Sequence, residues 1–96
     1  AIGRSSKTRP ILCLFEGVVT AAADGFWRMR ANPAATLLHL GPGYANGMAN
    51  LHNAKKAFSS MVNIIGDHAE WHLQFDAPLT SDLEGHVKLH SDWFNK

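Results

Sequence analysis

Residues 33–43 read Pro-Ala-Ala-Thr-Leu-Leu-His-Leu-Gly-Pro-Gly, and this stretch decides the fold. Its apolar run, Ala34 to Leu40, follows a proline and ends at the Gly-Pro-Gly of residues 41–43. Short apolar runs between turn residues are typical of strands buried on both faces of a parallel sheet. We therefore expect a buried strand over residues 34–40, followed by a turn at the glycines.

The same alternation continues on both sides of this stretch. Similar apolar runs at residues 11–15 and 61–65 predict two more strands. Apolar residues at helical spacing from Val18 predict a helix that stops at Asn32-Pro33, and a second helix fits residues 44–58. Strands that alternate with helices of this length imply crossovers and a parallel sheet. The predicted fold class is therefore α/β, a three-layer sandwich with a mostly parallel sheet and alternating helices.

In such a sheet, the carboxyl ends of the three strands lie at one edge, where open α/β sheets bind their ligands. That edge would bring together residues 16–17, 41–43 and 66–68. Beyond His68 the pattern is weaker and predicts only a helical turn over residues 69–74 and a short helix capped at Ser81-Asp82. We find no internal repeat or linker, so we expect one domain over residues 1–96.

Composition excludes several function classes. The chain has 96 residues, 46% of them hydrophobic, and a formal net charge of +1. This balance excludes a disordered chain and a strongly basic nucleic-acid binder. No apolar run is long enough to span a bilayer, and residues 1–9 lack a secretory signal. We expect a cytoplasmic protein, without nucleic-acid or membrane partners, in which the single cysteine, Cys13, is reduced and buried.

Several motifs resemble one family in a single register, over about residues 10–85. The motifs are Phe15-Glu16-Gly17-Val18, Ala23-Asp24-Gly25-Phe26, Arg28-Met29, Pro33 to Gly43, Asn46-Gly47, Asn50 to Ala54, Gly66-Asp67-His68, His72, Asp76 to Leu79 and Ser81-Asp82. They resemble the N-terminal, pyrimidine-binding (Pyr) domain of thiamine-diphosphate-dependent enzymes of the acetolactate synthase type. The order of the Glu, Ala-Asp-Gly and Gly-Pro-Gly motifs makes the resemblance specific.

The resemblance implies a catalytic role for Glu16, which would hydrogen-bond the aminopyrimidine ring of thiamine diphosphate. We expect burial beside Leu14 and Phe15 to raise the pKa of the Glu16 carboxyl group and to favour proton sharing with the ring. On spacing alone, Glu16 fits an exposed acid in the first turn of a helix, stabilised by the helix dipole, better than it fits a cofactor-binding residue.

The resemblance also places Gly41, Pro42, Gly43 and Asn46 at the cofactor. Glycine at these positions would let the backbone approach the ligand, although an ordinary strand-to-helix turn explains the motif as well. Asn46, Asn50 and Asn53 share one helix face, which is either solvated or a polar interface. The resemblance implies an interface, because active sites in this family form between subunits, either in a homo-oligomer or with a full-length enzyme subunit.

In this family, diphosphate and Mg²⁺ bind to a second domain, and the motif for this binding is Gly-Asp-Gly followed by a later Asn. The nearest string here, Gly66-Asp67-His68, has a different third residue. We therefore expect a partial domain that binds the pyrimidine half only and is inactive alone, with its sheet lacking the family's first strand. Ala21, Trp27 and Trp71 depart from the family pattern and put close packing against a partner in doubt.

The resemblance implies 2-oxo acid decarboxylation and carboligation as the reaction class. Two alternative functions remain. The first is a non-catalytic interaction or regulatory module, or a decayed fragment. The second is a zinc protein, because His68 and His72 are four residues apart, as are His86 and His90. Such pairs can chelate zinc from one helix face, but they do not form a His-Glu-x-x-His motif. We expect no metal site in this chain.

Overall fold

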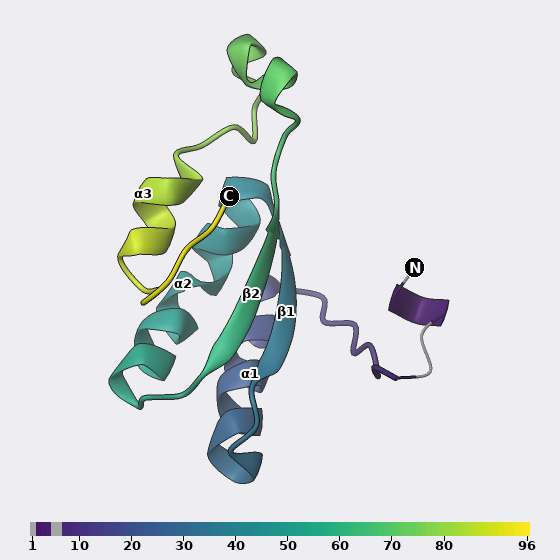
Figure 1. Cartoon of the computed structure of the whole chain (residues 1–96), viewed down its shortest axis with the longest axis vertical. Coiled ribbons are helices and arrows are strands. Elements are labelled where there is room, and N and C mark those ends of the chain that lie inside the picture. The colour runs from purple at the N-terminus through teal and green to yellow at the C-terminus, as the bar shows by residue number, and fades with distance from the viewer. Residues whose placement is uncertain (1, 5–6) are drawn as a thin grey trace.

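The computed structural model of the chain describes residues 2–4 and 7–96. Two strands, β1 (Ala34–His39) and β2 (Met61–Gly66), pair in parallel, with His39 opposite Gly66 at their carboxyl ends. The helices are η1 (Ile2–Arg4), α1 (Glu16–Arg30), α2 (Leu40–Lys56), η2 (Glu70–Phe75) and α3 (Leu83–Lys88), and Figure 1 shows their arrangement. The predicted α/β class, with helices alternating with parallel strands, is confirmed.

The connection from β1 to α2 is abrupt. Leu40 has a φ of 57°, a left-handed conformation that is strained for a leucine, and α2 begins at this residue. The Gly-Pro-Gly sequence forms the first turn of α2, so the helix starts four residues earlier than predicted. Pro42 is tolerated there because the first N–H groups of a helix have no partner within it. This sharp turn brings the amino end of α2 to the carboxyl edge of the sheet.

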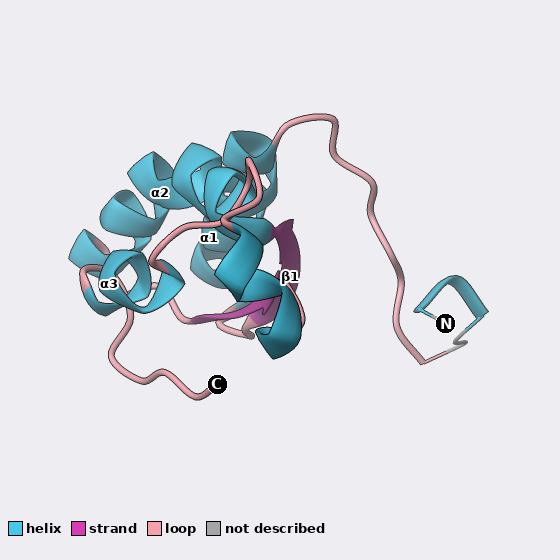
Figure 2. Cartoon of the chain, turned by 90° about the horizontal axis from the view of Figure 1, so that it is seen from above, coloured by secondary structure: helices cyan, strands magenta, loops and turns pink. Residues whose placement is uncertain are grey.

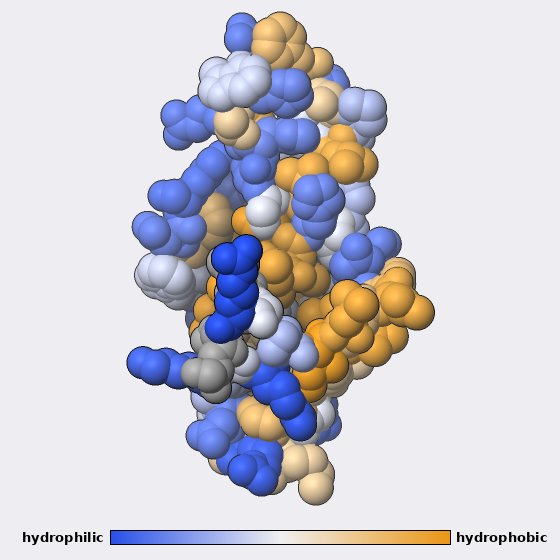
Figure 3. All heavy atoms as spheres, turned by 90° about the vertical axis from the view of Figure 1, so that its right-hand side faces the viewer, coloured by the Kyte–Doolittle hydropathy of each residue, from blue (hydrophilic) through white to orange (hydrophobic). Residues whose placement is uncertain are grey.

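The helices cover one face of the β1–β2 sheet, as Figure 2 shows from above. The buried core on that face consists of Leu38, Tyr44, Leu51 and Val87. The other face carries Leu37, Val62 and Ile64, whose residues are between 53 and 59% exposed. Figure 3 views the molecule from the β1 side, and hydrophobic side chains gather across the middle of that view. The uncovered sheet face is therefore apolar.

The strand predicted over residues 11–15 is wrong. The segment has no ladder partner, and its four large apolar residues, Ile11, Leu12, Leu14 and Phe15, are between 52 and 97% exposed. Among the described residues, β1 and β2 pair only with each other, so nothing satisfies the backbone of this segment as a strand. It leads away from the body of the chain in Figures 1 and 2. Cys13 is free, as expected, but it is half-buried rather than buried.

Helices α1 and α2 pack closely along a seam of small residues. The Thr20 hydroxyl donates to the carbonyl oxygen of Gly47 at 2.9 Å, and the Asn50 amide donates to the carbonyl oxygen of Gly17 at 2.8 Å. A Cβ atom on Gly47 would lie 2.8 Å from Cγ2 of Thr20. The absence of a side chain at Gly47 therefore sets the distance between the two helices.

Replacing Gly47 with alanine should destabilise the chain. Overpacking against Thr20 costs about 1–3 kcal/mol, more than the gain of up to about 1 kcal/mol from better helix propensity. Gly25→Ala is the matched control, since a Cβ atom there meets nothing within 4 Å, and it should stabilise by about 0.5–1 kcal/mol. Urea unfolding of both variants measures the difference, and Thr20→Ser should restore the stability of Gly47→Ala. Equal stability of the two alanine variants would contradict this packing.

The carboxyl-terminal third follows the sequence prediction. η2 forms the expected helical turn, and α3 begins after Asp82, whose side chain accepts a hydrogen bond from the N–H of Gly85 at 2.9 Å. This cap turns α3 so that Val87 enters the core. Within the described ranges, no helix is both long and apolar enough to cross a membrane.

Candidate functional site

The candidate site lies at the carboxyl edge of the sheet, where α1 and α2 both begin. Glu16 is the first residue of α1, and its Oε2 accepts a hydrogen bond from Nδ2 of Asn46 at 3.1 Å. A Cβ atom on Gly43, in the first turn of α2, would lie 3.5 Å from Oε1 of Glu16 and 3.7 Å from Cβ of His39. We call Glu16, His39, Gly43 and Asn46 the edge site.

Each member of the edge site is positioned by the packing described above. The seam between α1 and α2 fixes their relative register through Thr20 and Asn50, and this register brings Asn46 to Glu16. His39 ends β1, and Gly43 follows one turn after the bend at Leu40. Two helix amino ends therefore meet at one carboxyl group, an arrangement that favours negative charge.

The electrostatics of Glu16 differ from the sequence prediction. The pKa of its carboxyl group is lowered, first by a hydrogen bond from its own backbone N–H and then by the Asn46 side chain. Nearby His39 lowers the pKa further, and desolvation opposes these effects only in part. The predicted rise in pKa is therefore wrong for this chain. It assumed cover from Leu14 and Phe15, whose residues are instead exposed.

The lowered pKa of Glu16 gives a pH dependence with a defined sign. A carboxyl group whose pKa is lower in the folded state stabilises the fold above its unfolded pKa, and this stability is lost as pH falls through the folded pKa. Carbon-13 NMR titration should place the pKa of Glu16 below 4.5, the ordinary value for this group. Asn46→Ala should raise that pKa, whereas Asn53→Ala, an exposed amide on the same helix, should leave it unchanged.

Of the other residues predicted at the carboxyl edge of the sheet, Gly66 lies next to the edge site, whereas Asp67 and Gly41 contact other parts of the chain. Gly66 lies beside His39, since a Cβ atom there would be 4.0 Å from Nδ1 of His39. Asp67 turns away, and its carboxylate pairs with the Lys96 ammonium at 3.4 Å. Gly41 packs against Ser81, whose side chain would overlap a Cβ atom at this position. The close packing of Gly41 is thus explained within the chain itself.

Asn46, Asn50 and Asn53, which share one face of α2, form hydrogen bonds within this chain. Asn46 and Asn50 donate to residues of α1, and Asn53 donates to Oδ1 of Asn50 at 3.5 Å. No second subunit is needed to explain the first two. His39 is the site residue that sequence reasoning missed as a functional candidate. Its position as the last strand residue before Gly-Pro-Gly is the signal that could have identified it.

Four of the histidine side chains lie in two pairs and do not form a metal-binding cluster. The rings of His68 and His72 have centroids 5.2 Å apart, and those of His52 and His90 are 6.3 Å apart. In the described part of the chain, no group of three or more His, Cys, Asp or Glu side chains could hold a metal ion. The zinc alternative therefore has no three-ligand cluster in the described structure to support it.

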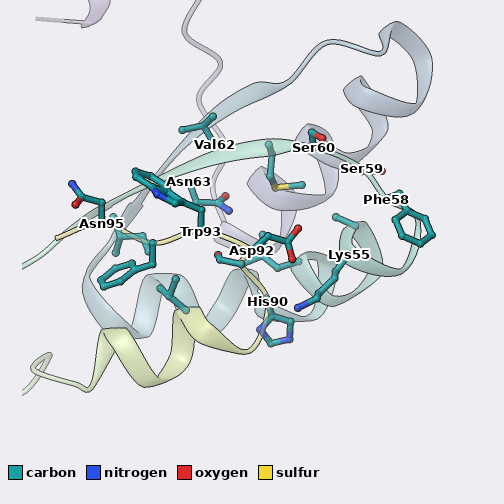
Figure 4. Close-up of a pocket in the computed structure, with 17 residues that line it drawn as sticks. Lys55, Phe58, Ser59, Ser60, Val62, Asn63, His90, Asp92, Trp93 and Asn95 are labelled. Atoms are coloured by element: carbon teal, nitrogen blue, oxygen red, sulfur yellow. The ribbon is translucent and has the colours of Figure 1, made fainter.

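A cavity of about 560 Å³ lies at the opposite end of the sheet from the edge site. Figure 4 shows Lys55, Phe58, His90 and Trp93 among its lining residues, which come from the end of α2, the start of β2 and the carboxyl-terminal segment. None of the four edge-site residues lines it. The cavity is therefore separate from the edge site.

The carboxylate of Glu16 thus lies at the carboxyl edge of a parallel α/β sheet, held by Asn46 and close to Gly43. This is the edge at which open α/β domains bind their ligands. Residues 1–90 match the family described as "Thiamine pyrophosphate enzyme, N-terminal TPP binding domain". The chain belongs to this family.

Two relatives give the comparison more detail. Over 96 residues the chain is 50% identical to the Mycobacterium tuberculosis protein named "Putative acetolactate synthase large subunit IlvX", covering 100% of this chain and 19% of that protein. Over 73 residues it is 37% identical to benzoylformate decarboxylase of Pseudomonas aeruginosa, covering 76% of this chain and 14% of that enzyme. The chain thus spans less than a fifth of either relative. No solved structure matches it significantly.

Proposed function

We propose that this chain provides the pyrimidine-binding half of a thiamine diphosphate site, with Glu16 as its catalytic carboxyl group. The observation that carries the proposal is the geometry of Glu16. Asn46 holds Oε2, while Oε1 faces a space that a Cβ atom on Gly43 would fill. A flat, nitrogen-containing ring fits this donor set, because a carboxyl oxygen can share a proton with a ring nitrogen. This donor set supports an aminopyrimidine as the ligand of the edge site.

In this role Glu16 holds a proton at Oε1, facing the ring, and Asn46 keeps the carboxyl group in that orientation. The cofactor, when bound, supplies a thiazolium carbon that can add to the carbonyl group of a 2-oxo acid. The lowered pKa of Glu16 belongs to the uncovered site. Covering the carboxyl group with an apolar ring adds desolvation, which raises its pKa toward proton sharing. By resemblance, the backbone of Gly41, Pro42 and Gly43 would lie along the same approach, and Gly43 is the one of the three that contacts the edge site.

Gly43→Ala separates ligand binding from folding. The added Cβ atom makes only ordinary contacts, at 3.5 Å or more from its neighbours. The free energy of unfolding should therefore stay constant or rise by up to about 1 kcal/mol, since alanine favours a helix over glycine. The affinity for an aminopyrimidine should fall at least severalfold, as isothermal calorimetry would show. Unchanged affinity would remove Gly43 from the site.

The complete reaction requires a second domain that holds the diphosphate and Mg²⁺. The chain spans 19% of its acetolactate-synthase-like relative. We infer that this second domain lies outside these 96 residues, in the same protein or in a full-length enzyme subunit, and that the two domains together act on 2-oxo acids such as pyruvate by decarboxylation and carboligation. The two domains would meet in the cytoplasm.

Reconstitution tests this function. The chain is mixed with a separately produced diphosphate-binding domain of an acetolactate synthase, thiamine diphosphate, Mg²⁺ and pyruvate. We expect turnover in the mixture, none with either component alone, and none when the chain carries Glu16→Gln. Turnover by the chain alone, or equal turnover with Glu16→Gln, would overturn the proposal.

A non-catalytic interaction module is a second candidate, favoured by the uncovered apolar face of the β1–β2 sheet. Such a module would change the activity of a full-length enzyme by contact alone. Glu16→Gln would then leave the effect intact, whereas Leu37→Glu would abolish it. The reverse pattern favours the cofactor function.

A further inference from the structure

A strained residue stands at the edge site. Among the described residues, four that are not glycine have a positive φ: Ala31, Leu40, Phe58 and Asp76. Ala31 and Asp76 are the C-caps of α1 and η2, and Phe58 follows the C-cap of α2. Left-handed residues commonly end a helix. Leu40 is the exception, because its left-handed backbone begins a helix, directly after His39.

The presence of a leucine at this bend is informative. Glycine adopts a left-handed conformation without strain, so a bend alone would favour glycine at this position. Leu40 is only 5% exposed, and its side chain is therefore held by the surrounding structure. Backbone strain persists only where the surroundings hold a residue in place, and it clusters at functional sites. The buried leucine therefore fixes the bend in one conformation, which a glycine would leave free.

The residue after Leu40 is confined as well. Gly41 packs so closely against Ser81 that a Cβ atom on Gly41 would overlap the Ser81 side chain. The carbonyl oxygen of Leu79 lies 3.8 Å from the same position. The bend is thus held by the burial of Leu40 and by the loop that packs on Gly41.

The bend sets the distance between two members of the edge site. His39 precedes Leu40, and a Cβ atom on Gly43, three residues after it, would lie 3.7 Å from Cβ of His39. The same position on Gly43 lies 3.5 Å from Oε1 of Glu16. We infer that Leu40 is a positioning residue, whose buried side chain locks the bend and thereby fixes both residues around Glu16. The inference rests on the proposed function only for what the edge site binds.

NMR of the labelled chain tests this lock without any ligand. The wild type should show a left-handed φ at Leu40 and a nuclear Overhauser effect between Hα of Gly43 and Hβ of His39. Leu40→Gly should weaken that effect roughly threefold or more, because nothing then fixes the bend. Leu40→Met keeps a buried apolar side chain of similar size and should retain the effect. Val87→Ala controls for lost burial, since Val87 is 3% exposed but lies in α3, and it should also retain the effect.

Several results would overturn the positioning role. They are a negative φ at Leu40 in the wild type, an effect that persists in Leu40→Gly, and an equal loss in Val87→Ala. Where Leu40→Gly does not fold, Ser81→Gly takes its place, because it opens the other side of the bend from a loop. The same effect should then weaken in Ser81→Gly, and an unchanged effect there overturns the role.

Calorimetry with 4-amino-5-hydroxymethyl-2-methylpyrimidine connects the bend to binding. Leu40→Gly should bind this ligand roughly fivefold more weakly than the wild type, or weaker still, because a loosened site loses affinity. Leu40→Met and Val87→Ala should stay within about twofold of the wild type. Equal affinities of Leu40→Gly and the wild type overturn the inference. A wild type that does not bind contradicts the proposed function instead, and the NMR result then decides the role of Leu40.

Discussion

Glu16→Gln should weaken binding of an aminopyrimidine roughly ten- to a hundredfold, because hydrogen bonds that involve a charged or shared proton are among the strongest in a site. Glutamine keeps the size of the side chain and a carbonyl oxygen, but it has no titratable proton to share. The fold should survive, because Glu16 stands at the surface end of α1 and its carboxyl group accepts hydrogen bonds from Asn46 and from its own backbone N–H, not from the core.

Isothermal calorimetry with 4-amino-5-hydroxymethyl-2-methylpyrimidine measures this loss. Glu84→Gln serves as the matched control, since Glu84 is an exposed acid in the first turn of another helix, α3. It should leave the affinity within twofold of the wild type. Similar losses in the two variants would show a general charge effect rather than recognition by Glu16.

The largest effect on stability is expected at Tyr44. Its residue is 0% exposed and belongs to the core cluster with Leu38, Leu51 and Val87. Truncating a buried aromatic residue to alanine typically costs about 3–5 kcal/mol. A domain of this size has only about 5–15 kcal/mol in total. Tyr44→Ala should therefore shift the urea midpoint far down or leave the chain unfolded.

Two further variants separate the ring of Tyr44 from its hydroxyl group. Burial raises the pKa of Tyr44, with Ser91 close enough to oppose this effect, yet the hydroxyl makes no hydrogen bond of good geometry. Tyr44→Phe should therefore change the unfolding free energy by less than about 1 kcal/mol. Phe58→Ala, which removes an exposed ring, should stay within about 0.5 kcal/mol of wild type. A large loss in Tyr44→Phe would show that the hydroxyl is bonded after all.

Periodicity in the sequence predicted the elements that pack within this chain. The β1 strand, the β2 strand and the helices α1 and α2 appear where apolar spacing placed them, because their apolar faces find partners in the same 96 residues. The start of α2 was placed four residues late, since glycine and proline normally indicate a turn. In the first turn of a helix they are tolerated, and the left-handed Leu40 makes the bend instead.

The conformation of residues 11–15 and the charge state of Glu16 could not be predicted from the sequence, because both depend on what surrounds them. Residues 11–15 have the composition of a strand, but a strand also needs a neighbouring strand with which to form hydrogen bonds. Glu16 lies beside Gly43, as the predicted sheet edge implied, although the strand over residues 11–15 from which that position was argued does not form. The direction of its pKa shift was set by Asn46 and the backbone, contacts that exist only after α1 and α2 pack.

The most direct test of the central claim is an NMR titration of the nitrogen-15-labelled chain with 4-amino-5-hydroxymethyl-2-methylpyrimidine. We expect saturable shifts that concentrate on the amides of Glu16, Gly43 and Asn46, and we expect Glu16→Gln to abolish them. Shifts confined to the cavity around Phe58 and Trp93, or shifts that persist in Glu16→Gln, would contradict it.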